Sequence, residues 1–256
     1  MSALPVAAVA PSLSRRLTAE FLGTGLLVTV VVGSGIAAQD LSQRDVGLQL
    51  LENSLATAFG LTVLILLFGP VSGAHFNPLV SLADWFVGRS GGTGLRLQDA
   101  GAYAAAQVVG AIGGALLANS MFGVPLALSA KDRLTGGHLI GEVVATAGLL
   151  GLIFSLARSR RATLSAPAVG AYIGAAYWFT SSTSFANPAV TVGRMFSATF
   201  TGISPGSTPG YIAAQVLGAA LGVAVVLFLY PDAAESAADV VVPHPTRGPT
   251  GPAPSG

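Results

Sequence analysis

The stretch HFNPLVS at residues 75–81 returns as FANPAVT at residues 185–191. In each copy an Asn-Pro pair opens a short apolar run, at 77–88 and at 187–198. Neither run reaches the roughly 20 residues that a helix needs to cross a bilayer. Asn is a favoured N-cap residue, and Pro is favoured in the first helical turn. The two copies therefore predict two half-helices, each beginning at its Asn.

Two further landmarks accompany the Asn-Pro pairs in the same order. Glu20 and Glu142 each lie near the start of an apolar run, and AAQVVGA at 105–111 returns as AAQVLGA at 213–219. The offsets between the copies are 122 residues for the Glu pair, 110 for the Asn-Pro pair and 108 for the AAQV pair. Three collinear landmarks predict an internal duplication.

The composition indicates an integral membrane protein. Of the 256 residues, 52% are hydrophobic and 9% are charged, against about 25% charged residues in soluble domains. Mean hydropathy is +0.70. A net charge of +1 argues against a nucleic-acid partner, and the absence of cysteine excludes disulfides and thiolate sites. Since no nucleophile–base pair or metal-binding cluster stands out, we expect neither an enzyme nor a cofactor.

Six apolar segments are long enough to span a bilayer, and their Gly and Ala content suits close helix packing, as at Gly110/Gly114 and Gly218/Gly222. They lie at about 17–38, 50–69, 99–121, 137–157, 164–182 and 209–230. We expect an N-terminal cytoplasmic segment (1–14), a channel domain (15–230, with halves 15–121 and 137–230) and a disordered Pro/Gly-rich cytoplasmic tail (231–256).

Each half holds three spans, so the second half is inverted relative to the first. Inverted repeats bring equivalent loops to the midplane from opposite sides. Irregular backbone at that depth must be packed in protein or line a watery cavity, so the sequence predicts a central cavity. With both termini inside, eight of the 12 basic residues are cytoplasmic and four are external. This bias predicts that orientation in the plasma membrane.

The motifs SGAHFNP at 72–78 and NPAV at 187–190, within six spans and with the paired Glu, resemble those of the aquaporin/aquaglyceroporin (major intrinsic protein) family. The resemblance covers about residues 15–230. It implies an all-α membrane protein with six transmembrane helices and two re-entrant half-helices in an inverted repeat. It also implies a passive channel for small neutral solutes, with membrane lipid as a partner and a homotetramer as the assembly.

The Asn-Pro motifs place Asn77, Pro78, Leu79, Asn187, Pro188 and Ala189 at the pore midplane. Two helix N-termini aimed at one point give a positive potential that repels cations. If both Asn amides donate to one solute oxygen, they interrupt proton hopping along a water file. The alternative is that each Asn only caps its helix.

Glu20 and Glu142 are buried carboxylates that need partners. The resemblance implies that they accept hydrogen bonds from the re-entrant loops, while a proton relay is the alternative. His75 is expected to line the cytoplasmic half of the pore.

The family usually has Arg directly after its second Asn-Pro-Ala, whereas this chain has Val190. Together with Phe59, Ala175 and Ser184 this residue forms the predicted selectivity constriction, with Thr57 as the alternative to Phe59. Such a constriction looks wider than that of a water channel and suits polyols or neutral metalloid hydroxides such as arsenous acid. Arg194, one turn beyond Val190, either replaces the missing charge or, as we favour, anchors an interface or an ion pair.

Two other functions stay open at this stage. A proton-coupled secondary transporter would use the buried carboxylates and His75 as proton carriers, and a structural membrane protein would conduct nothing.

Overall fold

The computed structural model describes residues 11–89 and 91–231, and within these ranges the chain is helical without strands. The predicted tail and residues 1–10 of the predicted N-terminal segment lie outside the described residues, apart from residue 231. The elements are α1 (Leu13–Leu41), α2 (Val46–Ser72), α3 (Pro78–Gly88), α4 (Leu97–Met121), α5 (Gly136–Arg158), the short 3₁₀ helix η1 (Ala162–Leu164), α6 (Ser165–Phe179), α7 (Pro188–Arg194) and α8 (Thr208–Leu229).

The helix starts follow local chemistry. Ser12, Asp45 and Thr135 cap α1, α2 and α5, and each side-chain oxygen accepts a hydrogen bond from a backbone N–H of the first turn. Pro stands at the start of both half-helices, α3 and α7, where its missing N–H costs nothing.

Five described helices, α1, α2, α4, α5 and α8, are long and apolar enough to cross a bilayer. Helix α6 has 15 residues, fewer than the predicted span of 164–182, and η1 precedes it. Helix α7 stops at Arg194, short of the predicted 198, because a loop takes up its last carbonyls. There the Ser129 N–H donates to the Met195 carbonyl over 2.7 Å.

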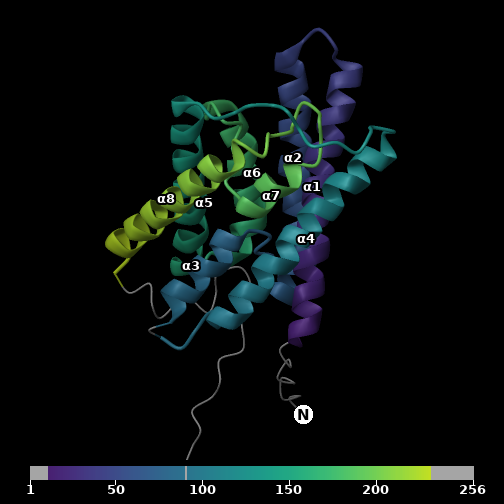
Figure 1. Cartoon of the computed structure of the whole chain (residues 1–256). Helices are drawn as coiled ribbons and strands as arrows, with labels where there is room; N and C mark the ends of the chain where they lie inside the picture. The colour runs from purple at the N-terminus through teal and green to yellow at the C-terminus, as the bar shows by residue number, and fades with distance from the viewer. Residues whose placement is uncertain (1–10, 90, 232–256) are drawn as a thin grey trace, which may run out of the picture.

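The two halves pack in the same way and run in opposite directions. Figure 1 shows α1 rising from the N-terminal end while α5, its counterpart, descends toward that end. Helix α1 packs on α4, and α5 packs on α8. A Cβ on Gly114 would meet the carbonyl oxygen of Gly25, and one on Gly222 would meet that of Ala147, inside contact distance. These small residues allow the close helix approach that the sequence predicts.

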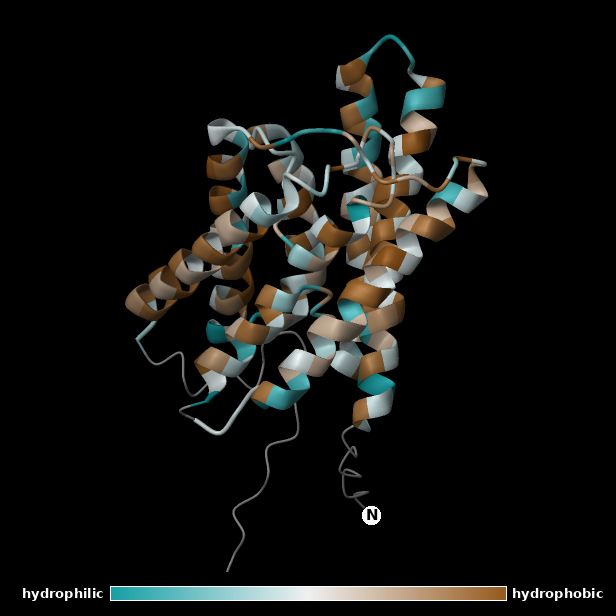
Figure 2. Cartoon of the chain, in the orientation of Figure 1, coloured by the Kyte–Doolittle hydropathy of each residue, from teal (hydrophilic) through white to brown (hydrophobic). Residues whose placement is uncertain are grey.

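The outward faces of the helices are apolar. Val63 and Leu66 on α2 and Val225 and Phe228 on α8 are exposed, Phe228 to 85%. In Figure 2 hydrophobic residues run along most of the helix lengths, and hydrophilic ones gather in the α1–α2 connection and at helix ends. Such an exterior suits hydrocarbon, so polar function is directed to the interior.

Candidate functional site

The two half-helices begin at Asn side chains that cap them. The Oδ1 atom of Asn77 accepts a hydrogen bond from the N–H of Leu79 over 3.0 Å. The Oδ1 atom of Asn187 accepts from the N–H groups of Ala189 at 3.0 Å and Val190 at 3.3 Å. Each amide oxygen is therefore committed to its own helix, and this fixes where the amide nitrogen points.

The amide nitrogens tie the two loops together reciprocally. Asn77 Nδ2 donates to the carbonyl of Ala186 over 2.8 Å, and Asn187 Nδ2 donates to the carbonyl of Phe76 over 2.7 Å. Both Asn residues line one internal cavity. Because an amide NH2 has two hydrogens, each Asn keeps a second N–H for which no described residue supplies an acceptor. The geometry thus combines capping with a free donor at the junction of the loops.

The loops hold ordinary side chains in the left-handed backbone region. Ala74 and Phe76 have φ of 49°, as does Ser184, and Ala186 has φ of 48°. They stand three residues and one residue before the Asn in both loops. Each costs about 1–2 kcal/mol, so something must hold the loops in place.

The buried carboxylates supply that restraint. Glu20 accepts from two backbone N–H groups of the first loop at 3.0 and 2.7 Å. Glu142 accepts from two in the second loop, both at 2.9 Å. Neither carboxylate is among the cavity-lining residues. They meet the geometry of a structural role, and a proton relay would need contact with the pore that they do not make.

A Gln completes each carboxylate site. Gln107 Nε2 lies 2.7 Å from Glu20 and 3.1 Å from the Ser81 hydroxyl, which belongs to α3. In the second half Gln215 Nε2 lies 2.6 Å from Glu142 and 2.9 Å from the Thr191 hydroxyl of α7. The duplication therefore extends to the hydrogen bonds that hold each half-helix.

The cavity is lined by residues of α1, α2, α5, α6 and both loops with their half-helices. In the part of the chain that the structure describes, its lining contains His75 and Arg194 but no acidic residue. Two helix N-termini and a guanidinium thus face a mostly apolar cavity, and each contributes positive potential there.

Two residues of the predicted constriction do not face this cavity. Phe59 is 68% exposed on the outside of α2, while Thr57 is 2% exposed and lines the cavity. Ala175 is exposed on α6, while Tyr177 lines the cavity. The predictions of Phe59 and Ala175 are therefore wrong.

Helix geometry explains both errors. The lining residues recur every four positions, as Thr57, Leu61 and Ile65 on α2 and as Ser165, Val169, Ile173 and Tyr177 on α6. A residue two positions away points about 200° around the helix, to the outside. On α2 the alternative residue, Thr57, therefore has the lining position, and on α6 Ala175 lies two positions from the lining residues Ile173 and Tyr177.

Ser184 and Val190, the other two predicted constriction residues, do line the cavity. Thr57 Oγ1 and the Tyr177 hydroxyl lie 3.1 Å apart. Tyr177 therefore gives the cavity an aromatic wall, which Phe59 does not, and adds a polar hydroxyl. Arg194 also lines the cavity, and no described carboxylate pairs with it, which contradicts the ion-pair alternative. The interface anchor stays an untested alternative.

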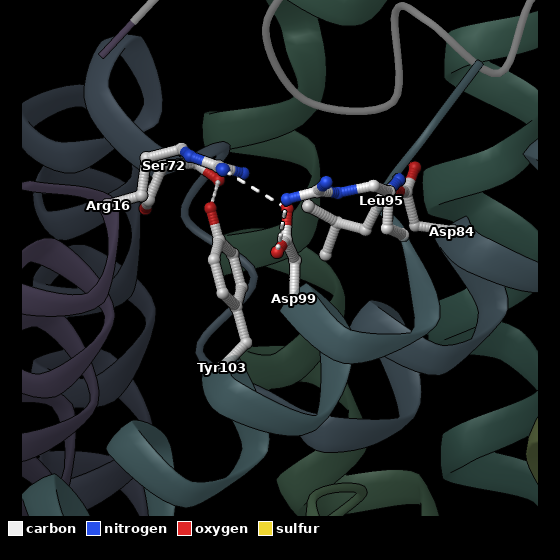
Figure 3. Close-up of polar contacts among 7 residues, drawn as sticks. Arg16, Ser72, Asp84, Leu95, Asp99 and Tyr103 are labelled. Carbon is white, nitrogen blue, oxygen red and sulfur yellow. Dashed lines mark hydrogen bonds and ion pairs between the residues drawn. The ribbon is translucent and has the colours of Figure 1, made fainter. Parts of the chain in front are cut away.

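His75 lies near the end of the cavity at which α1 begins. Its Nδ1 is 3.0 Å from the Ser81 hydroxyl, and its ring meets Tyr103 edge-on, with centroids 5.5 Å apart. The Tyr103 hydroxyl donates to the Ser72 carbonyl over 3.0 Å (Figure 3). The aromatic pair thus braces the last turn of α2 beside the first loop.

The same end carries ion pairs that the sequence does not suggest. Asp99 pairs with Arg16 at 3.2 Å and with Arg96 at 3.3 Å. Asp84 accepts from the Leu95 N–H over 2.7 Å (Figure 3). The Arg16 contact joins the start of α1 to α4, and the Asp84 contact joins α3 to the segment between α3 and α4.

At the opposite end, the loop before α5 contributes two cations that the sequence does not predict. Nothing in the sequence pattern places this loop against the segment between α7 and α8. Arg133 Nε donates to the Gly202 carbonyl over 2.8 Å, and Lys131 Nζ donates to the Phe200 carbonyl over 2.9 Å. Burial, then the charges of Arg133 and Arg194, lower the pKa of Lys131 from 10.5 to about 8.

Known proteins share this architecture and sequence. The major intrinsic protein family matches residues 7–186. Aquaglyceroporin AqpS of Rhizobium meliloti is 49% identical over 218 residues, covering 85% of this chain and 91% of that protein. The glycerol uptake facilitator protein of Pseudomonas aeruginosa is 33% identical over 172 residues, covering 60% and 61% of the two chains.

The X-ray structure of the aquaglyceroporin from Plasmodium falciparum superposes with a TM-score of 0.62, covering 86% of this chain and 96% of that one. At 20% identity this likeness bears on the fold alone. It agrees with the predicted arrangement of spans and re-entrant half-helices.

Proposed function

This chain belongs to the major intrinsic protein family, and from that premise we propose that it conducts water and small uncharged solutes passively, with protons and other cations excluded at the paired Asn-Pro loops. Members of the family are channels, so this multi-pass membrane protein is a channel and not an enzyme. The finer points are the barrier, the solute and the orientation.

The reciprocal Asn bonds carry the proposal. Asn77 and Asn187 each hold the opposite loop with one N–H, and both line the cavity. Their second N–H groups supply two donors for one solute oxygen, so a water at this point would accept twice and pass no proton through. The N-termini of α3 and α7 add positive potential at the same place. Each Asn can cap its helix and donate to a solute at the same time, because Oδ1 accepts from the helix and Nδ2 carries the donor hydrogens.

The proposed constriction is Thr57, Tyr177, Ser184 and Val190. It combines hydroxyl groups with an aliphatic wall and lacks a charge directly after the second Asn-Pro-Ala. That mixture suits solutes with both hydroxyl groups and carbon surface, such as glycerol-like polyols, or compact neutral hydroxides such as arsenous acid. The names of the relatives, an aquaglyceroporin and a glycerol uptake facilitator, support the polyol class.

We place both termini on the cytoplasmic side of the plasma membrane, on the distribution of basic residues. His75 then lies in the cytoplasmic half of the pore, and the loop with Lys131 lies outside. A homotetramer with one pore per subunit is proposed from family membership, and the apolar exterior is compatible with it.

Stopped-flow permeability of proteoliposomes for water, glycerol, urea and arsenite tests the function. We expect glycerol and arsenite to equilibrate faster than in protein-free liposomes, and a pH gradient to leave the end point unchanged. Solute accumulation driven by the pH gradient would instead identify a proton-coupled transporter. Permeability equal to that of empty liposomes for every solute would identify a non-conducting protein.

A further inference from the structure

Arg194 is a cation buried inside the protein, beside the pore. Its side chain is 2% exposed, yet it belongs to the cavity lining. A charge in such a place is costly unless it is paired or hydrogen-bonded. What its nitrogen atoms contact therefore decides what it does.

The described contacts satisfy only part of the guanidinium. Nε donates to the carbonyl of Thr201, and Cζ lies 3.4 Å from the ring centroid of Phe185. The ion pairs of the described residues both involve Asp99, at the far end of the molecule. Within residues 11–89 and 91–231 nothing accepts a hydrogen bond from the two terminal nitrogens, so four N–H donors remain for whatever occupies the cavity.

A second polar group without a hydrogen-bond partner belongs to the lining of the same cavity. Ser184 Oγ is buried and has no hydrogen-bond partner among the described residues. The Thr57–Tyr177 hydroxyl pair lines the cavity too, as do the aliphatic side chains of Val190 and Ile173. The cavity therefore combines hydrogen-bonding groups that have no partner with aliphatic side chains.

We propose that Arg194 and Ser184 form a solute-binding site in the outer half of the pore, selective for neutral solutes with hydroxyl oxygens on the same or adjacent atoms. This inference rests on the proposed channel function. It also makes Arg194 the cation barrier of this half. The charge is displaced four residues along α7, about 6 Å at 1.5 Å per residue, from the position held by Val190.

The chemistry follows from the shape of the side chain. A guanidinium is a planar fork that can donate to two oxygens at once, and the Ser184 hydroxyl supplies a third contact. The aliphatic wall receives the carbon side of the solute. Since no acidic group lines the cavity in the described part of the chain, the permanent charge repels Na⁺ and K⁺.

Variants of Arg194 and Ser184 separate the effect of the planar guanidinium donors from the effect of the positive charge. Arg194→Lys keeps the charge but removes the fork, and Arg194→Gln removes both. Ser184→Ala removes a hydroxyl that makes no hydrogen bond to the described residues. Arg133→Lys is the matched control, because Arg133 is also buried, at 7% exposure, and lies over Phe185 at 5.3 Å. It does not line the cavity, and its Nε and Nη2 donate to backbone carbonyls instead.

The measurements are water, glycerol and Na⁺ fluxes in proteoliposomes, with size-exclusion profiles in detergent as a check on folding. Losing one hydrogen bond to a charged group corresponds to about a tenfold loss or more, so we expect Arg194→Lys to lower glycerol flux by about that factor. The Ser184 hydroxyl is neutral, so we expect Ser184→Ala to lower glycerol flux by about two- to tenfold. Water flux should change far less. Arg194→Gln should in addition admit Na⁺, and Arg133→Lys should match the wild type.

Equal glycerol-to-water ratios in the Arg194 and Ser184 variants and in Arg133→Lys would overturn the inference while leaving the channel intact. A wild-type protein that conducts neither water nor glycerol would overturn the proposed function itself. If both Arg194 variants fail to fold, Ser184→Ala decides. A normal glycerol flux in that variant would reject the site.

Discussion

Val190 is the residue at which this pore departs most from its family pattern, and its uncharged side chain forms part of the cavity wall. Replacing it by Arg adds bulk and a second cation one turn from Arg194. We expect Val190→Arg to suppress glycerol and arsenite flux more than water flux, because the larger solutes need the width. Stopped-flow permeabilities on one protein preparation measure the ratio.

Val190→Leu is the control for that substitution, since it adds bulk without charge. If it lowers the glycerol-to-water ratio as much as Val190→Arg does, width alone sets the preference. Equal changes in glycerol and water flux in Val190→Arg would show that Val190 is not part of the constriction.

Lys131 makes the stability of the loop before α5 depend on pH. Burial and the neighbouring Arg charges lower its pKa from 10.5 to about 8, so the folded protein binds fewer protons than the unfolded chain between these values. Stability from this group therefore rises with pH across that window. We expect the unfolding midpoint of the wild type in detergent to gain on that of Lys131→Gln between pH 8 and 10.5. A constant difference between the two proteins across this range would contradict the assignment.

At the residue scale, the sequence predicts which residue types line the pore better than it predicts which face of a helix points inward. The motif locates Asn77, Asn187, Ser184 and Val190 because each is counted within a few residues of Asn-Pro. Phe59 and Ala175 lie on helices that a loop separates from the Asn-Pro motifs. An error of two residues in counting across that loop selects a residue on the outer face of the helix instead of the inner one. Glu20 and Glu142 are found because a carboxylate in an apolar span needs partners.

At the scale of elements, close packing of α1 on α4 depends on glycine. A Cβ on Gly114 would meet the Gly25 carbonyl oxygen, whereas one on Gly113 meets nothing within 4 Å. We expect Gly114→Ala to destabilise the protein by about 1–3 kcal/mol, because the backbones must separate. Gly113→Ala should be neutral or stabilising by up to about 1 kcal/mol, since it removes glycine from a helix.

Thermal unfolding of the two variants in one detergent measures the difference. Equal midpoints would mean that α1 and α4 can move apart at no cost. The test isolates packing, because both changes add the same methyl group one residue apart on the same helix.

Element starts are more predictable than element ends. The sequence places the starts of α3 and α7 because Asn and Pro act locally. It extends α7 too far, to 198, because the loops that take up the terminal carbonyls of α7 come from residues far away or later in the chain. Helix α6 is shorter than its apolar run for a related reason: Ser182 and Ser184 belong to the loop that Glu142 holds.

At the scale of the whole molecule, duplication decides the architecture. Three spans per half force the second half to run opposite to the first, so two equivalent loops meet, and each donates an Asn amide N–H to a carbonyl of the other. The sequence predicts this because symmetry leaves one arrangement. It does not predict which side chains line the half of the cavity near α7, where Arg194 breaks the symmetry because its counterpart in the first half is Asp84.

The orientation of the molecule in the membrane is a separate matter, because an inverted repeat looks similar from both sides. Since the chain has no cysteine, single introduced cysteines report without background. Gln43, between α1 and α2, and Ser159, after α5, are both exposed and lie at opposite ends. We expect a membrane-impermeant maleimide to label Gln43→Cys in intact cells and Ser159→Cys only after lysis, because Arg158, Arg160 and Arg161 favour the cytoplasm. If Ser159→Cys is labelled in intact cells and Gln43→Cys only after lysis, the Arg194 site lies on the cytoplasmic side. Solutes that leave the cell would then reach Arg194 before they reach the Asn-Pro loops.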